Sequence, residues 1–200
     1  MTNNWIIHPT ILKGSTIDLI PLEKGHFEDL YVAAADKEIW GLIPTDCSGK
    51  EKFYEAYITA LAEREKGVQY PFVIYHKASK KFIGSTRLFE IYPKDSKLEI
   101  GWTWLTKDYW GSGINLECKY LLLQFCFDVL HTVRVQLKTD ELNMRSRKAI
   151  EKIGGKFEGI LRKERLKDNG LYRNAVYYSI LDEEWEGVRV KLQSLLKNTK

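Results

Sequence analysis

The sequence contains few cysteines, and their placement indicates neither a disulfide nor a metal site. The three are Cys47, Cys118 and Cys126, with no Cys-x-x-Cys pair and no histidine-rich cluster in the chain. If Cys118 and Cys126 share a helix, a rise of ~1.5 Å per residue separates them by about 12 Å, beyond the ~7 Å Cα limit for a disulfide. We expect buried thiols in a reducing cytosol and no bound metal.

Long apolar runs are also missing. The longest apolar stretch, residues 116–130, is interrupted by Glu117, Lys119, Gln124 and Asp128. A membrane-spanning helix needs about 20 consecutive apolar residues, so this stretch predicts a helix of a soluble protein that does not enter a membrane. The first residues show no basic segment followed by an apolar one, which predicts no signal peptide and a cytoplasmic location.

The residues that are present suffice for one packed domain. Apolar residues make up 44% of the chain and charged residues 29%, with 6 Trp, 11 Tyr and 8 Phe. This composition is typical of a globular protein, and 200 residues are enough for one domain but few for two. A single domain over residues 1–200 is expected.

The net charge of +4 is unevenly distributed. Between Asn143 and Arg173 there are ten Lys and Arg residues against four Asp and Glu residues. Such a basic segment is consistent with an anionic partner, such as a nucleotide phosphate, an acidic substrate or RNA. A solvated charged face explains the same pattern equally well.

Hydrophobic periodicity and turn residues predict alternating strands and helices. The predicted strands are Thr16–Ile20, Pro71–Tyr75, Phe82–Phe89, Leu98–Leu105, Val133–Lys138, Phe157–Arg165 and Leu171–Leu181. The predicted helices are Lys24–Ala35, Glu51–Lys66, a long one ending near Leu130, Asn143–Ile153 and Asp182–Leu196. Because hairpins are mixed with one βαβ crossover, we expect a mixed sheet with helices on both faces.

A glycine-containing loop precedes the long helix. Gly111 and Gly113 stand where the chain enters it. Glycines allow close approach of the backbone to a ligand, and the first helical N–H groups are unpaired at the positive end of the helix dipole. The combination suits a pyrophosphate. A Gly-x-Gly pair alone, however, is more typical of an ordinary helix entry.

In its motifs and their order, the chain resembles the GNAT superfamily of N-acetyltransferases, specifically the branch with the ribosomal-protein N-terminal acetyltransferases. The resemblance extends from about Leu12 to Trp185. It is carried by the segment Leu12–Leu22, the strand Ile100–Leu105, the glycine loop, the segments Asn143–Ser146 and Ile153–Gly159, and the closing hairpin.

The resemblance implies a particular fold. We expect a GNAT-like, mostly antiparallel central sheet of about six to seven strands, with helices on both faces and a splayed central strand pair. The domain core would cover residues 12–185, followed by a C-terminal helix over 182–196.

The resemblance also implies an activity and partners. We expect an N-acetyltransferase that moves acetyl from acetyl-CoA to a primary amine by direct attack in a ternary complex. The acceptor could be a protein N-terminus, a polyamine, an amino sugar or a drug amine. Related enzymes are often dimers, so a homodimer stays open, whereas no membrane or nucleic-acid partner is expected.

The cofactor-binding residues implied by the resemblance include two departures from the superfamily pattern Gln/Arg-x-x-Gly-x-Gly/Ala. Trp110 stands where Gln or Arg is usual and Asn115 where Gly or Ala is usual, while Gly113 matches. The implied acetyl-CoA contacts are Trp104, Leu105, Trp110, Gly111, Ser112, Gly113, Ile114, Asn115 and Asn143. Trp104 and Leu105 would offer backbone groups to the pantetheine arm.

Two catalytic residues follow from the same resemblance. Ser146, three residues after Asn143, would stabilise or protonate the departing CoA thiolate, and Glu164 would be the general base. Glu99 and a water chain are the competing bases. Without the resemblance, Asn143 is also a good helix N-cap and Ser146 an ordinary first-turn residue.

Two other functions compete with the enzyme. A non-catalytic acyl-CoA-binding sensor is favoured by the departures at Trp110 and Asn115 and disfavoured by Ser146 and the carboxylates. An RNA-associated module would use the basic segment, but the chain lacks an aromatic RNA-recognition signature and a Gly-x-x-Gly clamp.

Overall fold

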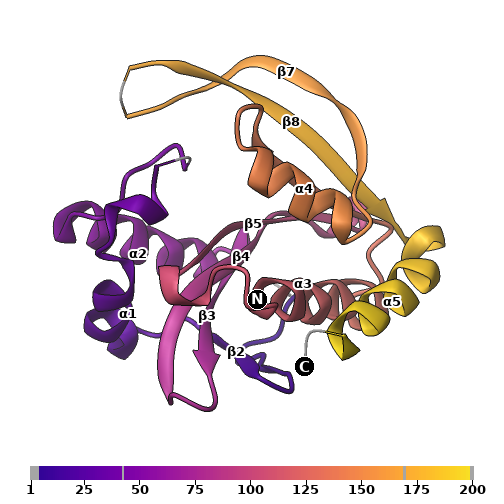
Figure 1. Cartoon of the computed structure of the whole chain (residues 1–200), viewed down its shortest axis with the longest axis horizontal. Helices are drawn as coiled ribbons and strands as arrows, with labels where there is room; N and C mark the ends of the chain where they lie inside the picture. Colours follow the sequence, from indigo (N-terminus) through magenta and orange to yellow (C-terminus); the bar gives the residue numbers. More distant parts are fainter. Residues whose placement is uncertain (1–4, 42, 169, 199–200) are drawn as a thin grey trace.

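The computed structural model describes residues 5–41, 43–168 and 170–198 of the chain. Over these residues it contains one eight-stranded sheet (Figure 1). The strands are β1 (Leu12–Lys13), β2 (Ile17–Pro21), β3 (Gln69–His76), β4 (Lys81–Tyr92), β5 (Lys97–Leu105), β6 (Arg134–Asp140), β7 (Lys156–Leu166) and β8 (Tyr172–Leu181). Their order in the sheet is β1-β2-β3-β4-β5-β6-β8-β7. All neighbouring pairs are antiparallel except β5 and β6.

The predicted mixed, mostly antiparallel sheet is therefore confirmed, with one strand more than expected. The additional strand is β1, whose two residues are too few to produce a periodic pattern. Each of the seven predicted strands is present, with its ends displaced by at most three residues.

Helices cover both faces of the sheet. They are α1 (Phe27–Ala34), α2 (Lys50–Glu65), α3 (Ile114–Gln124), α4 (Met144–Lys152) and α5 (Asp182–Lys197). Side chains of β3 alternate between two hydrophobic clusters: Phe72 and Ile74 belong to the cluster with α3 and α5, and Val73 to the cluster with α1 and α2. Because both faces of β3 are buried under helices, its side chains are apolar on both faces of the sheet.

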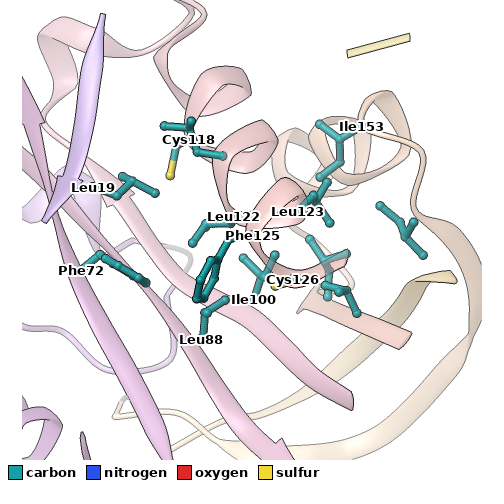
Figure 2. Packing of buried hydrophobic residues seen from close by; sticks show 14 of the residues in the cluster. Leu19, Phe72, Leu88, Ile100, Cys118, Leu122, Leu123, Phe125, Cys126 and Ile153 are labelled. Carbon is teal, nitrogen blue, oxygen red and sulfur yellow. The ribbon is translucent and has the colours of Figure 1, made fainter. Parts of the chain in front are cut away.

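The larger cluster lies between the sheet and α3. Figure 2 shows Phe72, Leu88 and Ile100 of the strands facing Leu122 of α3 and the following turn. All three cysteines are free thiols and buried, which confirms the expected burial. The long helix differs from its prediction in one respect: α3 ends at Gln124, and the chain continues as a π-helical turn over Phe125–Val129.

The central pair β5 and β6 separates after three residues. Lys97–Glu99 pair with Arg134–Gln136, but β5 continues to Leu105 and β6 to Asp140 without further mutual pairing. On its other edge, β5 has a register shift against β4, and Trp102 there has φ of +50°. The bulge bends β5 away from β6. The predicted splay of the central pair is thus confirmed.

The β7–β8 hairpin extends beyond the rest of the sheet, with α4 beside it (Figure 1). Arg147 and Glu151 of α4 both bond the Tyr178 hydroxyl of β8. At the hairpin tip, Asp168 accepts hydrogen bonds from Lys52 (2.8 Å) and from the Asp46 N–H (3.2 Å), so the tip reaches the region of α2. Among the described helices, none combines the length and apolar composition needed to cross a bilayer.

Candidate active site

A cavity of about 450 Å³ opens where β5 and β6 separate. Its walls come from β5, β6, the start of α3 and one side of α4. Of the residues expected from the sequence to bind or act, it is lined by Glu99, Trp104, Leu105, Trp110, Gly111, Gly113, Asn115, Asn143 and Ser146. Ser112 and Ile114 instead line a smaller hollow of about 150 Å³ next to Gly113, and Glu164 lines neither. The fold therefore gathers most of the expected residues around one space.

The glycine loop provides the conformation that an anion cradle requires. Gly111 and Gly113 have φ of +75° and +83°, in the left-handed region that favours glycine. Gly113 is the N-cap of α3, and the first intrahelical bond runs from the Glu117 N–H to the Gly113 carbonyl. A Cβ atom at Gly111 would have no atom within 4 Å, so the loop faces open space. The α3 amides that precede Glu117 have no preceding helical turn to bond, which suits them to bind phosphate oxygens.

Trp110, one of the two departures from the superfamily pattern, ties the loop to the end of β5. Its Nε1 donates to the Leu105 carbonyl at 3.0 Å, and the Arg145 guanidinium lies 4.1 Å from the ring centroid. A carbonyl oxygen has two lone pairs, so Leu105 keeps one acceptor position for a ligand. Trp110 also holds a cation of α4, Arg145, in the wall of the cavity.

Asn143 and Ser146 begin α4. The Asn143 Oδ1 accepts from the Ser146 N–H at 3.0 Å, so Asn143 is an N-cap, as its position without the resemblance suggested. Within the described residues the Ser146 hydroxyl has no hydrogen-bond partner, and the side chain lines the cavity. Its hydroxyl is thus available to a ligand.

Glu99 is the buried carboxylate of the cavity, with 1% of its surface exposed. Its Oε2 accepts from the Gln136 Nε2 at 2.7 Å and lies 3.4 Å from the Lys138 Nζ. Burial raises the pKa of Glu99 to about 7, because desolvation outweighs the attraction of Lys138 and the bond from Gln136. Near neutral pH this carboxylate can accept a proton and release it again.

Glu164, the base expected from the resemblance, has a different environment. Its Oε2 accepts from the Arg173 guanidinium, 3.1 Å from Nη2, and its Oε1 accepts from the Tyr177 hydroxyl at 3.4 Å. The Lys138 Nζ lies 3.6 Å from the same Oε1. Both oxygens are engaged, and the side chain is not part of the cavity wall. The geometry brings Glu99, the competing base, to the cavity.

Comparison with known proteins identifies the family. The family model that describes the acetyltransferase (GNAT) domain matches residues 17–156, more than half of the chain. The chain belongs to the acetyltransferase (GNAT) family. The expected resemblance, the fold and the assignment to acetyl-CoA-dependent N-acetyltransferases are thereby confirmed at the level of the family.

Individual GNAT relatives agree with this assignment. The putative ribosomal N-acetyltransferase YdaF of Bacillus subtilis (strain 168) is 36% identical over 52% of this chain and 56% of its own length, so the chain matches only about half of that relative. The probable N-acetyltransferase YjcK of the same organism is 29% identical over 88% of this chain and 99% of its own. A solved structure of a putative acetyltransferase from T. thermophilus superposes with a TM-score of 0.84 and 34% identity, covering 96% of this chain and 99% of that one.

The GNAT cavity also contains two cations that no sequence motif marks. Lys138 lies between Glu99 and Glu164, and Lys119 of α3 lines the cavity although only 7% of its surface is exposed. In the sequence, Lys119 merely interrupts an apolar stretch. The available signal was its spacing: it follows Asn115 by four residues, which places both side chains on one face of α3.

Proposed function

We propose that this protein transfers the acetyl group of acetyl-CoA to a primary amine by direct attack in a ternary complex. The observation that carries the proposal is the cavity at the separation of β5 and β6, with the buried Glu99 and the free Ser146 hydroxyl on its walls. The activity belongs to a single domain over residues 1–200, acting in the cytoplasm and without a metal.

Two parts of the cavity suit two parts of acetyl-CoA, the pyrophosphate and the pantetheine arm. The positive-φ glycines and the unpaired α3 amides suit the pyrophosphate, with Ser112, Ile114 and Asn115 contributing to the cradle. Beyond the loop, the gap between β5 and β6 accommodates the pantetheine arm, with backbone groups of Trp104 and Leu105 beside it. Asn143, an N-cap that also lines the cavity, would contact the same arm.

Amine acetylation requires a neutral amine, and Glu99 is the base that we propose. The protonated amine must lose a proton before it attacks, and a base with a pKa near the working pH both accepts and releases protons efficiently. The pKa of Glu99, raised to about 7 by burial, meets this requirement. Glu164 is instead a positioning residue, since it holds Arg173 and Lys138 beside the cavity.

Ser146 is the donor that we propose for the leaving group. When the amine forms its bond to the acetyl carbon, the carbon–sulfur bond breaks and negative charge develops on sulfur. A hydroxyl within reach stabilises or protonates the thiolate. The Ser146 hydroxyl is free of other partners among the described residues, so no bond must be broken before it acts.

The acceptor is a primary amine of a protein N-terminus or of a small molecule. The relative YdaF is named as a putative ribosomal N-acetyltransferase. For this reason, the acceptors to be tested include a ribosomal protein as well as polyamines and amino sugars.

The test is thiol release from acetyl-CoA with a panel of amines and N-terminal peptides, together with calorimetric titration of CoA. We expect acceptor-dependent release that falls about 10- to 100-fold in Ser146→Ala, with CoA affinity retained. Ser194→Ala, at an exposed position of α5, is the matched control and should match the wild type. CoA binding without release for any acceptor would favour a non-catalytic sensor, and absence of CoA binding would refute the proposal.

A further inference from the structure

Lys119 is a buried cation without an acid partner. It projects from α3 into the cavity wall, and its Nζ donates to the Thr103 Oγ1 at 2.6 Å. Across the described ranges, no carboxylate lies within 4 Å of this ammonium, and Thr103 is its hydrogen-bond partner. An ammonium has three N–H donors, so two remain unsatisfied. Burying such a group is costly, and the pKa of Lys119 is lowered by desolvation.

The other cations of the cavity are engaged or exposed. Lys138 and Arg173 pair with carboxylates, Arg145 stacks on Trp110, and Lys152 and Arg165 are exposed to solvent. Lys119 thus combines burial with unused donors, and it faces the space in which the proposed reaction takes place. A ligand oxygen in this space would satisfy donors that the protein leaves open.

Thr103 connects Lys119 to the surroundings of Glu99. The Thr103 Oγ1 lies 3.4 Å from the Gly101 carbonyl oxygen and 2.8 Å from the Thr86 Oγ1. On the same glycine, the position of a Cβ atom would be 3.6 Å from the Glu99 Oε1. Gly101 is therefore close both to the proposed base and to Thr103, the hydrogen-bond partner of Lys119.

We propose that Lys119 and Thr103 form a binding site for the acyl carbonyl oxygen of acetyl-CoA. The inference rests on the proposed function and adds the groups that stabilise the negative charge on the carbonyl oxygen. As the amine nitrogen bonds to the acetyl carbon, the carbonyl electron pair moves to oxygen, which becomes negative until the carbon–sulfur bond breaks and the pair returns. A pre-positioned ammonium in a buried site stabilises that oxygen strongly. Glu99 takes the proton from the amine at the same centre.

The site is tested by equilibrium binding of two unreactive analogues. One keeps the carbonyl, as the ketone analogue of acetyl-CoA in which a methylene replaces the sulfur; the other, S-ethyl-CoA, lacks it. We expect the wild type to prefer the ketone. Lys119→Met should weaken ketone binding about tenfold or more and change S-ethyl-CoA binding less than about twofold, while kcat falls about 10²- to 10³-fold. Lys191→Met, at an exposed position of α5, is the matched control.

A second pair of variants, at Thr103, distinguishes loss of the carbonyl site from a folding defect in Lys119→Met. Thr103→Val should reproduce the selective loss of ketone binding in milder form, and Thr103→Ser, which keeps the hydroxyl, should restore it. Equal weakening of both analogues in Lys119→Met, or no change in either, would overturn the carbonyl site alone. Failure of the wild type to bind either analogue would overturn the proposed function as well.

Discussion

The Oε2 of Glu99 lies 3.4 Å from the Nζ of Lys138, where β5 and β6 begin to separate. Such a neighbour normally lowers the pKa of a carboxyl group, yet the pKa of Glu99 is raised to about 7. Desolvation wins because the Glu99 side chain is nearly fully buried, whereas Lys138 also lies near Glu90 and Glu164. The pair is therefore suited to proton exchange rather than to a permanent ion pair.

The first prediction concerns the pH dependence of catalysis. In the wild type, kcat/KM for the amine should rise with pH through about 7 as Glu99 loses its proton. Glu99→Gln should remove this rise, the limb of the pH profile near pH 7, and lower kcat/KM about 10²- to 10³-fold. The measurement is a pH–rate profile of both proteins with one acceptor, since the amine itself titrates identically in both.

Glu164→Gln is the matched variant for this experiment. It should retain the limb near pH 7, because Glu164 lies outside the cavity wall. If Glu164→Gln loses the limb and Glu99→Gln keeps it, the assignment of the base is reversed.

A second prediction concerns the free energy of unfolding and rests on the same pKa of Glu99. The folded protein binds the Glu99 proton more tightly than the unfolded chain, where the pKa is near 4.5. The resulting stabilisation is fully present below pH 4.5 and is lost as pH rises through about 7, a change of about 3 kcal/mol. Urea unfolding at about pH 5 and about pH 7.5 measures it. In Glu99→Gln, the free energy of unfolding should decrease less between these two pH values than in the wild type. An equal decrease in both proteins would contradict the pKa assignment.

Most of the fold could be predicted from local pattern. β3 appears in the sequence as an apolar run followed by a polar turn. The helix predicted over Asp182–Leu196 forms as α5, and both elements lie close to their predicted limits. The π-helical turn at Phe125–Val129 could not be predicted, because its apolar residues continue the helical pattern of α3. Only the backbone bonding distinguishes the two conformations.

The candidate site was less predictable, because it depends on tertiary placement. Glu99 and Glu164 are both strand carboxylates, and nothing in their local sequence says which one is buried. The separation of β5 from β6 decides it, by leaving Glu99 at the last paired position while Arg173 engages Glu164. Lys119 cannot be predicted from the sequence for the same reason: a lysine in an apolar helix is usually exposed to solvent, and here it is buried.

A third prediction concerns Trp110. Trp110→Phe keeps the ring under Arg145 but removes the indole bond to the Leu105 carbonyl, a contribution of about 1 kcal/mol. The glycine loop should then be held less firmly to β5, and KM for acetyl-CoA should rise about fivefold while the melting temperature changes little. Steady-state kinetics at saturating acceptor measure the effect.

Trp5→Phe is the matched control for this variant, since the Trp5 indole N–H has no partner in the part of the chain that is described. It should leave KM for acetyl-CoA unchanged. An equal increase in both variants would mean that the Leu105 contact does not organise the loop.

The last prediction links the spacing of β4 and β5 to ligand binding. A Cβ atom at Gly84 of β4 would overlap the Trp104 carbonyl oxygen and lie 2.9 Å from the Leu105 Cδ2, both on β5. Gly84→Ala should push the strands apart, lower the free energy of unfolding by about 1–3 kcal/mol and weaken CoA binding. Gly187→Ala, on the exposed side of α5 with no atom within 4 Å, should instead stabilise by about 0.5–1 kcal/mol and leave CoA binding unchanged. Chemical denaturation and calorimetry of CoA decide between these outcomes. If Gly84→Ala lost stability but bound CoA normally, the end of β5 would not contact the ligand.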